Sequence, residues 1–171
     1  MKLVICLQRL DLSENNFGSA GTAALASFLA PQRITDADMT EKVLEMSLKE
    51  LLLTNCQLET ETLFKVLKES ALCESLSVLD VSKNKINKIA ADYFVQFIQS
   101  STAIHDLRLN NCSLMDKICV QLLTAISENS KLFDISIDLS QNELKAAGAS
   151  AIAPILRQIK NLFALNLRDN G

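Results

Sequence analysis

An eleven-residue pattern of apolar and polar positions recurs along this chain of 171 residues. Large apolar residues occupy its first, fourth, sixth and eleventh positions, and asparagine or cysteine occupies the ninth. Successive copies begin 41, 28, 28, 28 and 30 residues apart, which is too regular to arise by chance. The copies begin at Leu7, Leu48, Leu76, Ile104, Leu132 and Leu162.

Each copy predicts a short strand, a turn and a helix. In the third copy, Leu79 and Val81 share one parity and face inward, whereas Val78, Asp80 and Ser82 face outward. After the ninth position the apolar spacing becomes helical. The expected helical stripes are Met115, Ile118, Cys119, Leu122, Leu123 and Ile126; Ala149, Ile152, Ala153, Leu156 and Ile159; and Ala90, Phe94, Phe97 and Ile98.

A unit of this size cannot bury a core alone, so neighbouring copies must stack. The code and its period are those of the leucine-rich repeat. We therefore predict an α/β leucine-rich-repeat solenoid over residues 1–171, with about six repeats. Its parallel strands should line the concave face and its helices the convex face, with right-handed connections. Neither end carries a polar capping unit, so we expect a fragment of a longer array or a truncated product.

An insertion follows the first copy, around residues 31–47, where the interval exceeds the common period. Asp38 and Glu41 have the spacing of a capping box, and Val43, Leu44 and Met46 predict the apolar side of an extra helical turn. Insertions in solenoids emerge at the surface and often carry function. A tolerated loop is an equally open interpretation.

The ninth position of the code forms a column of Asn15, Cys56, Asn84, Cys112 and Asn142. A small polar side chain there can bind turn backbone that would otherwise be unpaired. The column's two cysteines lie two rungs apart, roughly 10 Å, which exceeds the ~7 Å that a disulfide allows. Since no Cys-x-x-Cys pair occurs either, we expect five reduced cysteines and a cytoplasmic location.

His105, Asp106 and Cys112 lie within one copy and suggest a catalytic set. The repeat argues against it, because Cys112 belongs to the turn, Asp106 to the outward strand face and His105 to the start of the strand. No Gly-rich phosphate loop, metal-ligand spacing or Gly-x-Ser-x-Gly is present. We therefore predict no catalytic residue, no cofactor, no metal site and no enzymatic activity.

Charge and aromatic residues narrow the classes of partner. A net charge of −3 and a pI near 5.2 argue against nucleic acid. Phe28, Phe94 and Phe97 are expected in the core, and Phe133 and Phe163 are expected to be partly exposed without a basic groove. No apolar run approaches the ~18–20 residues of a membrane span, so we predict no membrane insertion. Composition does not predict an oligomeric state.

Outward strand residues of successive copies should align on the concave face, where we expect a protein partner to bind. Arg108 is flanked by Asp80 and Asp106. These charges either neutralise one another across adjacent strands or bind a partner with basic or polar groups. The candidate residues are Asp11, Glu50, Leu52, Asp80, Asp106, Arg108, Asp134, Ser136 and Asn166.

The fifth copy contains two added residues in its strand code. The simplest alignment places Ser136 in the row of Asp80 and Asp134 in the row of Asp106. The added residues also predict a longer or bulged strand that re-aims Ser136 and Asp138.

The period and the asparagine–cysteine column resemble the ribonuclease-inhibitor-like class of leucine-rich repeats. Residues 134–171, with "SIDLSQNEL", "AAGA" and "DNG", look like the central array of the CARMIL family, the linkers of capping protein, Arp2/3 and myosin-I; residues 104–123 are similar to it more weakly. In that family a PH-like domain precedes the repeats, and a dimerisation region and a capping-protein-binding tail follow them. None of these is in the sequence, so no binding residue is carried over.

The resemblance implies a scaffold within a cytoplasmic regulator of actin assembly, associated with the cytoskeleton at the plasma membrane. Two alternatives share the repeat class. One is the sensor array of a cytosolic innate-immune receptor, and the other is a Ran-type GTPase-activating array.

Overall fold

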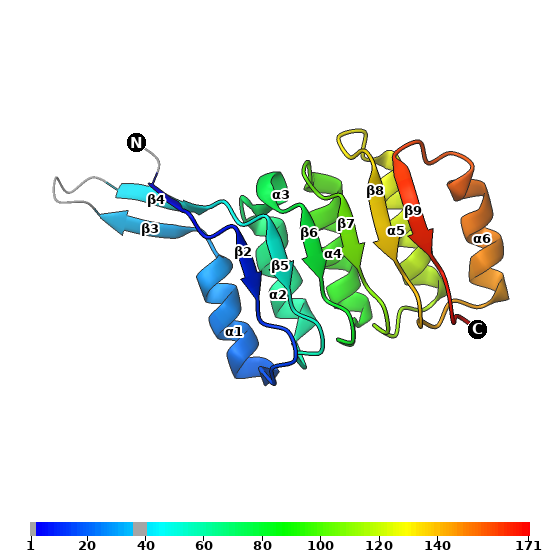
Figure 1. The fold of residues 1–171 in the computed structure, drawn as a ribbon, viewed down its shortest axis with the longest axis horizontal. Helices are drawn as coiled ribbons and strands as arrows, with labels where there is room; N and C mark the ends of the chain where they lie inside the picture. Colours follow the sequence, from blue (N-terminus) through cyan, green and yellow to red (C-terminus); the bar gives the residue numbers. More distant parts are fainter. Residues whose placement is uncertain (1–2, 36–40) are drawn as a thin grey trace.

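The computed structural model describes residues 3–35 and 41–171. Its largest sheet has six strands in chain order, and every neighbouring pair is parallel. Each copy of the code thus adds one strand beside the previous one (Figure 1). The strands are β2 (Arg9–Asp11), β5 (Glu50–Leu52), β6 (Val78–Asp80), β7 (Asp106–Arg108), β8 (Ile135–Asp138) and β9 (Leu162–Asn166).

The helices lie on one side of this sheet, behind the strands in Figure 1. Consecutive long helices pack side by side, as α2 does against α4. The arrangement confirms the α/β leucine-rich-repeat solenoid, with strands on the concave face and helices on the convex face. The helices are α1 (Gly18–Leu29), α2 (Thr60–Glu69), α3 (Leu72–Ser75), α4 (Lys88–Ser100), α5 (Asp116–Glu128) and α6 (Ala146–Leu156).

The core fills the space between sheet and helices. Leu79 and Leu107, one per strand, are fully buried, as the alternating pattern predicts. The rings of Phe64 and Phe94 stack with centroids 4.5 Å apart and join α2 to α4. The predicted burial of Phe94 and Phe97 is confirmed. The same prediction for Phe28 is wrong, because this ring is 41% exposed, whereas the buried residues of α1 are Thr22, Leu25, Ala26 and Leu29.

Two helical stripes are also narrower than predicted. Met115 is 56% exposed because it is the residue before the first turn of α5 rather than part of its inward face. Ala149 and Ala153 are exposed on α6, whose main helix contact is with α5 alone. Ile152, on the same helix, is buried as expected.

The insertion after the first copy and the segment before that copy together form a second, smaller sheet at one end of the array (Figure 1). Its strands are β1 (Leu3–Ile5), β3 (Gln32–Thr35) and β4 (Glu41–Met46), in the order β1-β4-β3. The predicted helical turn at Val43, Leu44 and Met46 is therefore wrong. Backbone pairing of β4 with β1 in parallel and with β3 in antiparallel outweighs the local capping signal. Asp38, the other half of that signal, lies outside the described residues.

The ninth-position column forms a ladder of hydrogen bonds, as expected, and it is buried from Cys56 onward. Asn84 Oδ1 accepts the backbone N–H groups of Cys56 and Leu58, at 3.0 and 3.1 Å. Its Nδ2 donates to the backbone oxygens of Leu53 on the preceding rung and of Val81 and Ser82 in its own turn, at 2.7 to 3.0 Å. Asn142 repeats this pattern two rungs later. The ladder therefore fixes the turns that carry each strand out of the concave face.

Candidate interaction face

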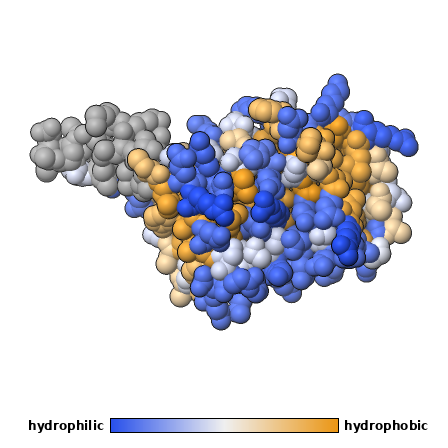
Figure 2. All heavy atoms as spheres, in the orientation of Figure 1, coloured by the Kyte–Doolittle hydropathy of each residue, from blue (hydrophilic) through white to orange (hydrophobic). Residues whose placement is uncertain are grey.

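The parallel register aligns outward side chains of the six strands into two rows along the concave face. Figure 2 views this face and shows hydrophilic residues across its middle, with hydrophobic residues toward the end formed by β9 and α6. The first row is Arg9, Glu50, Val78, Asp106, Ser136 and Ala164. The second row is Asp11, Leu52, Asp80, Arg108, Asp138 and Asn166.

The fifth copy does not have the alignment that we predicted. Ser136 pairs with Asp106 in the first row, and Asp138 pairs with Arg108 in the second. Asp134 precedes β8 with a left-handed backbone, φ 51°, so it stands at the edge of the face rather than in a row. The cause is the two added residues, which the chain absorbs before Ser136. The fifth strand is longer than its neighbours β6 and β7, which was one of the two predicted alternatives. The bulge lies instead in β9, because Ile135 pairs with Leu162 and Ser136 with Ala164, which leaves Phe163 without a partner in the register.

Both arginines of the face contact two carboxylates. Arg9 Nη1 lies 2.9 Å from Glu50 Oε2, and its Nη2 lies 3.7 Å from Asp11 Oδ2. Arg108 Nη2 lies 2.6 Å from Asp106 Oδ2, and its Nη1 lies 3.9 Å from Asp80 Oδ2. The hydrogen bond that Arg108 donates to Asp106 raises the pKa of Arg108. Charges in these clusters neutralise one another across strands, although such exposed pairs contribute only ~0–1 kcal/mol each.

Second-row carboxylates also bind their own turns. The backbone N–H of Ser82 donates to Asp80 Oδ1 at 3.0 Å, and that of Ser140 donates to Asp138 Oδ1 at 2.9 Å. The matching bond at Asp11 lowers the pKa of that carboxyl. These aspartates therefore have a structural role as turn caps. Leu52 of the same row is buried, with 8% of its surface exposed.

An exposed aromatic pair lies where strands β8 and β9 begin. Phe133 and Phe163 are 72% and 75% exposed, whereas the sequence predicted that they would be only partly exposed. Their rings border a shallow pocket of about 500 Å³. We call this surface the aromatic rim, and its residues are His105, Asp106, Phe133, Asp134, Ser136 and Phe163. The sequence signal for it is the second code position, which changes from polar residues in the first four copies to phenylalanine in the last two.

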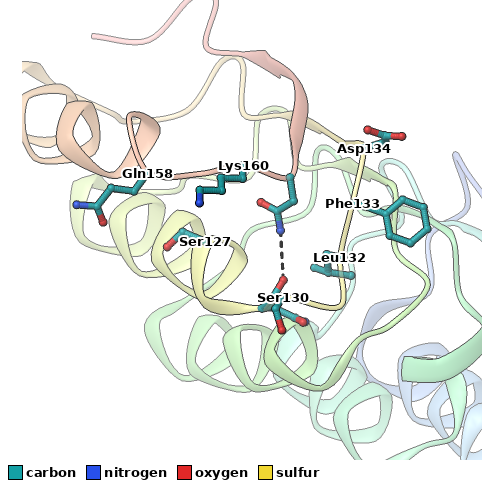
Figure 3. Close-up of a pocket in the computed structure, with 9 residues that line it drawn as sticks. Ser127, Ser130, Leu132, Phe133, Asp134, Gln158 and Lys160 are labelled. Atoms are coloured by element: carbon teal, nitrogen blue, oxygen red, sulfur yellow. Dashed lines mark hydrogen bonds between the residues drawn. The ribbon is translucent and has the colours of Figure 1, made fainter.

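A second pocket of about 540 Å³ adjoins the aromatic rim on the helix side. Figure 3 shows Phe133 and Asp134 directed away from the helix end that carries Ser127, whereas Lys160 lies on that helix side. Asn161 Nδ2 donates to backbone oxygens at the end of α5. Its buried Oδ1 has no hydrogen-bond partner among the described residues.

The histidine, aspartate and cysteine of the fourth copy do not form a catalytic set. Cys112 is fully buried, and its Sγ donates to the backbone oxygens of Val81 and Asn110 at 3.4 and 3.5 Å. Burial raises the pKa of this thiol to about 12, so it stays protonated at neutral pH. The side chain of His105 is exposed at the opposite end of β7.

Disulfides, metal clusters and membrane-spanning helices are all absent from the part of the chain that the structure describes. No disulfide joins cysteines within the described ranges. In the same ranges, no group of three or more His, Cys, Asp or Glu side chains could hold a metal ion. None of the helices described is long and apolar enough to cross a bilayer.

The parallel rungs, the helices on one face and the ninth-position ladder define a leucine-rich-repeat protein. Residues 5–26 and 135–153 match the family described as "Leucine Rich repeat". Mouse ribonuclease inhibitor is 28% identical over 96% of this chain and 40% of its own length.

Two relatives have more specific names. "Protein CARMIL" of Dictyostelium discoideum is 29% identical over 99% of this chain. Human "Capping protein, Arp2/3 and myosin-I linker protein 3" is 30% identical over 96% of the chain. The predicted resemblance to the CARMIL family is confirmed. The chain spans only 15% and 11% of the lengths of these two relatives.

Proposed function

We propose that this chain is a non-catalytic protein-binding scaffold within a cytoplasmic regulator of actin filament assembly. In this proposal residues 1–171 act as one array of about six repeats, and partner proteins dock on its concave face. The observation that carries the proposal is the similarity to CARMIL proteins along almost the entire chain. One of these relatives is named as a linker of capping protein, Arp2/3 and myosin-I.

The geometry of the concave face supports docking of a protein. Its six strands pair in one sheet, and side chains point out of the plane of a sheet, so the surface that it presents consists of side chains. Those side chains combine charged, polar and apolar groups in fixed rows, which is the composition of a selective protein interface. The candidate residues Asp106, Arg108, Ser136 and Asn166 face this surface in the two rows.

Asp106 is the best residue at which to test the concave face. Its carboxylate contacts Arg108, and it has no turn-capping bond of the kind that Asp80 makes with Ser82. Asp106→Lys therefore reverses a charge in the first row without removing a turn cap. Glu128→Lys makes the same charge change at the exposed end of α5 and serves as the matched control.

The experiment is proximity labelling in cells with the chain fused to a biotin ligase. The wild-type chain and Glu128→Lys should enrich proteins of actin filament assembly relative to the ligase alone, and Asp106→Lys should lose most of that enrichment. Circular dichroism should show the same fold for all three proteins. Absence of any such enrichment would refute the actin assignment, and equal enrichment by Asp106→Lys would refute docking on the concave face.

A further inference from the structure

The aromatic rim exposes two large apolar rings that the repeat does not require. Phe133 lies on the fifth of six rungs, with a strand on each side of β8, and is nevertheless 72% exposed. Its exposure is therefore not a consequence of lying at the edge of the sheet. The preceding residue, Leu132, is 3% exposed and fills the core position of the same rung.

Other copies show that the second code position needs no apolar group. Gln8, Lys49, Ser77 and His105 occupy it in the first four copies. The array thus accommodates polar side chains there. Phenylalanine at this position in two consecutive copies lowers solubility without filling the core. Exposed aromatic residues gathered at one place mark an interaction site.

Charge around the rings indicates what kind of group would bind. Asp134 has no ion-pair partner in the described part of the chain. Asp106, on the other side of the pocket, is paired with Arg108 at 2.6 Å, so Asp134 carries the uncompensated negative charge of the rim. Lys160 borders the adjoining pocket and not this one. The rim therefore combines apolar rings with a net negative charge.

We propose that the aromatic rim binds a segment of a partner protein in which a lysine or arginine lies close to bulky apolar side chains. The apolar side chains would lie between Phe133 and Phe163, and the cation would approach Asp134 and Asp106. This inference specifies the partner chemistry of the proposed scaffold and rests on that function. The negative charge disfavours two other occupants of an aromatic patch, an anionic lipid surface and a second copy of the same acidic rim.

The probe is a set of three immobilised twelve-residue peptide pools. The first pool combines Lys and Arg with Leu, Ile and Phe; the second replaces the basic residues by Asp and Glu; the third replaces the apolar residues by Ser and Gly. The chain should bind the first pool at least about tenfold more tightly than either of the others. Added salt should weaken that binding, because part of it is electrostatic.

Two variants connect this binding to the rim. Phe133→Ser combined with Phe163→Ser should weaken binding of the first pool by about tenfold to a hundredfold, the scale expected for burying one or two rings. Asp134→Asn, which keeps the shape and tolerates the left-handed backbone, should weaken it by a smaller factor and reduce the effect of salt. Phe28→Ser is the control, since that ring is 41% exposed on α1, away from the rim.

Each other outcome overturns the proposal. These outcomes are equal binding of the three pools, no measurable binding of any, and binding that survives the double phenylalanine variant. Sedimentation that shows a dimer lost in that variant would make a second copy the occupant. Binding to anionic phosphatidylserine vesicles lost in the same variant would make it a membrane. If peptide binding fails while Asp106→Lys still abolishes labelling in cells, the rim assignment fails and the scaffold stands.

Discussion

Asn84→Ala removes the side chain that joins two successive rungs of the array. Asn84 is 1% exposed and makes five hydrogen bonds to backbone groups. Two of its partners are the N–H groups of Cys56 and Leu58, on the preceding rung. Alanine can neither accept from these groups nor donate to the carbonyls, and the buried site leaves water little access.

The loss of stability in Asn84→Ala depends on which backbone groups are left without any hydrogen-bond partner. The oxygen of Ser82 still accepts the N–H of Asn55, so its loss is partial. The N–H groups of Cys56 and Leu58 have no other acceptor among the described residues. A buried group left without a partner costs ~1–3 kcal/mol. We expect Asn84→Ala to lower the free energy of unfolding by ~3–5 kcal/mol, a large part of the ~5–15 kcal/mol typical of a domain.

The measurement is urea unfolding under reducing conditions, followed by far-ultraviolet circular dichroism. Fluorescence of Tyr93, the one tyrosine in a chain without tryptophan, gives a second probe in α4. Coincident transitions would show that the array unfolds as one unit. Asn15→Ala is the matched control, because Asn15 holds the same code position but is exposed and makes only two of these bonds. It should cost ~1 kcal/mol or less. An equal loss in the two variants would refute the ladder as a source of stability.

Two further predictions concern the cysteines and one helix. Without prior reduction, iodoacetamide should label all five cysteines once the chain is unfolded, and mass spectrometry that finds fewer than five labels would reveal a disulfide. In the folded chain the exposed Cys6 should react first. Cys112 should react very slowly, because it is buried and its pKa is raised to about 12. Gly148→Ala should destabilise the array by ~1–2 kcal/mol in urea unfolding, although alanine normally favours a helix. The reason is that the added Cβ would collide with Asp116, whose carboxylate caps α6 by accepting the N–H of Lys145. A gain in stability would contradict this packing.

The rungs could be predicted from sequence because the code itself sets their register. Copies that begin with the same apolar positions must stack with those positions inward, so Glu50, Val78 and Asp106 align without further information. The ninth-position ladder was predictable for the same reason. Its geometry has a consequence that the code does not reveal. The residue before each ladder position has a left-handed backbone although none is glycine: Glu14, Asn55, Lys83, Asn111, Gln141 and Asp169, with φ between 52° and 62°.

Where the period changes, the structure depends on pairing between strands that are distant in the sequence, and the local pattern does not show that pairing. In the fifth copy, the two added residues fit either before or within the strand. Pairing of Ser136 with Asp106 on β7 decides between these alternatives, and that contact is not local. The insertion shows the same limit. Its capping-box spacing is a local signal, whereas Leu44 and Met46 pair with β1, about forty residues away in sequence.

Residues with a binding function are best sought at positions where the fold of the repeat does not require a particular type of side chain. Inward leucines and ladder asparagines are required by the fold. Asp80 and Asp138, which look like free surface charges in the sequence, also serve the fold, because each caps its own turn. The second code position has no such duty, since four different polar residues occupy it in the first four copies. A change to phenylalanine in two consecutive copies therefore fills no core position, because both rings are exposed, and this is why we propose a recognition site there.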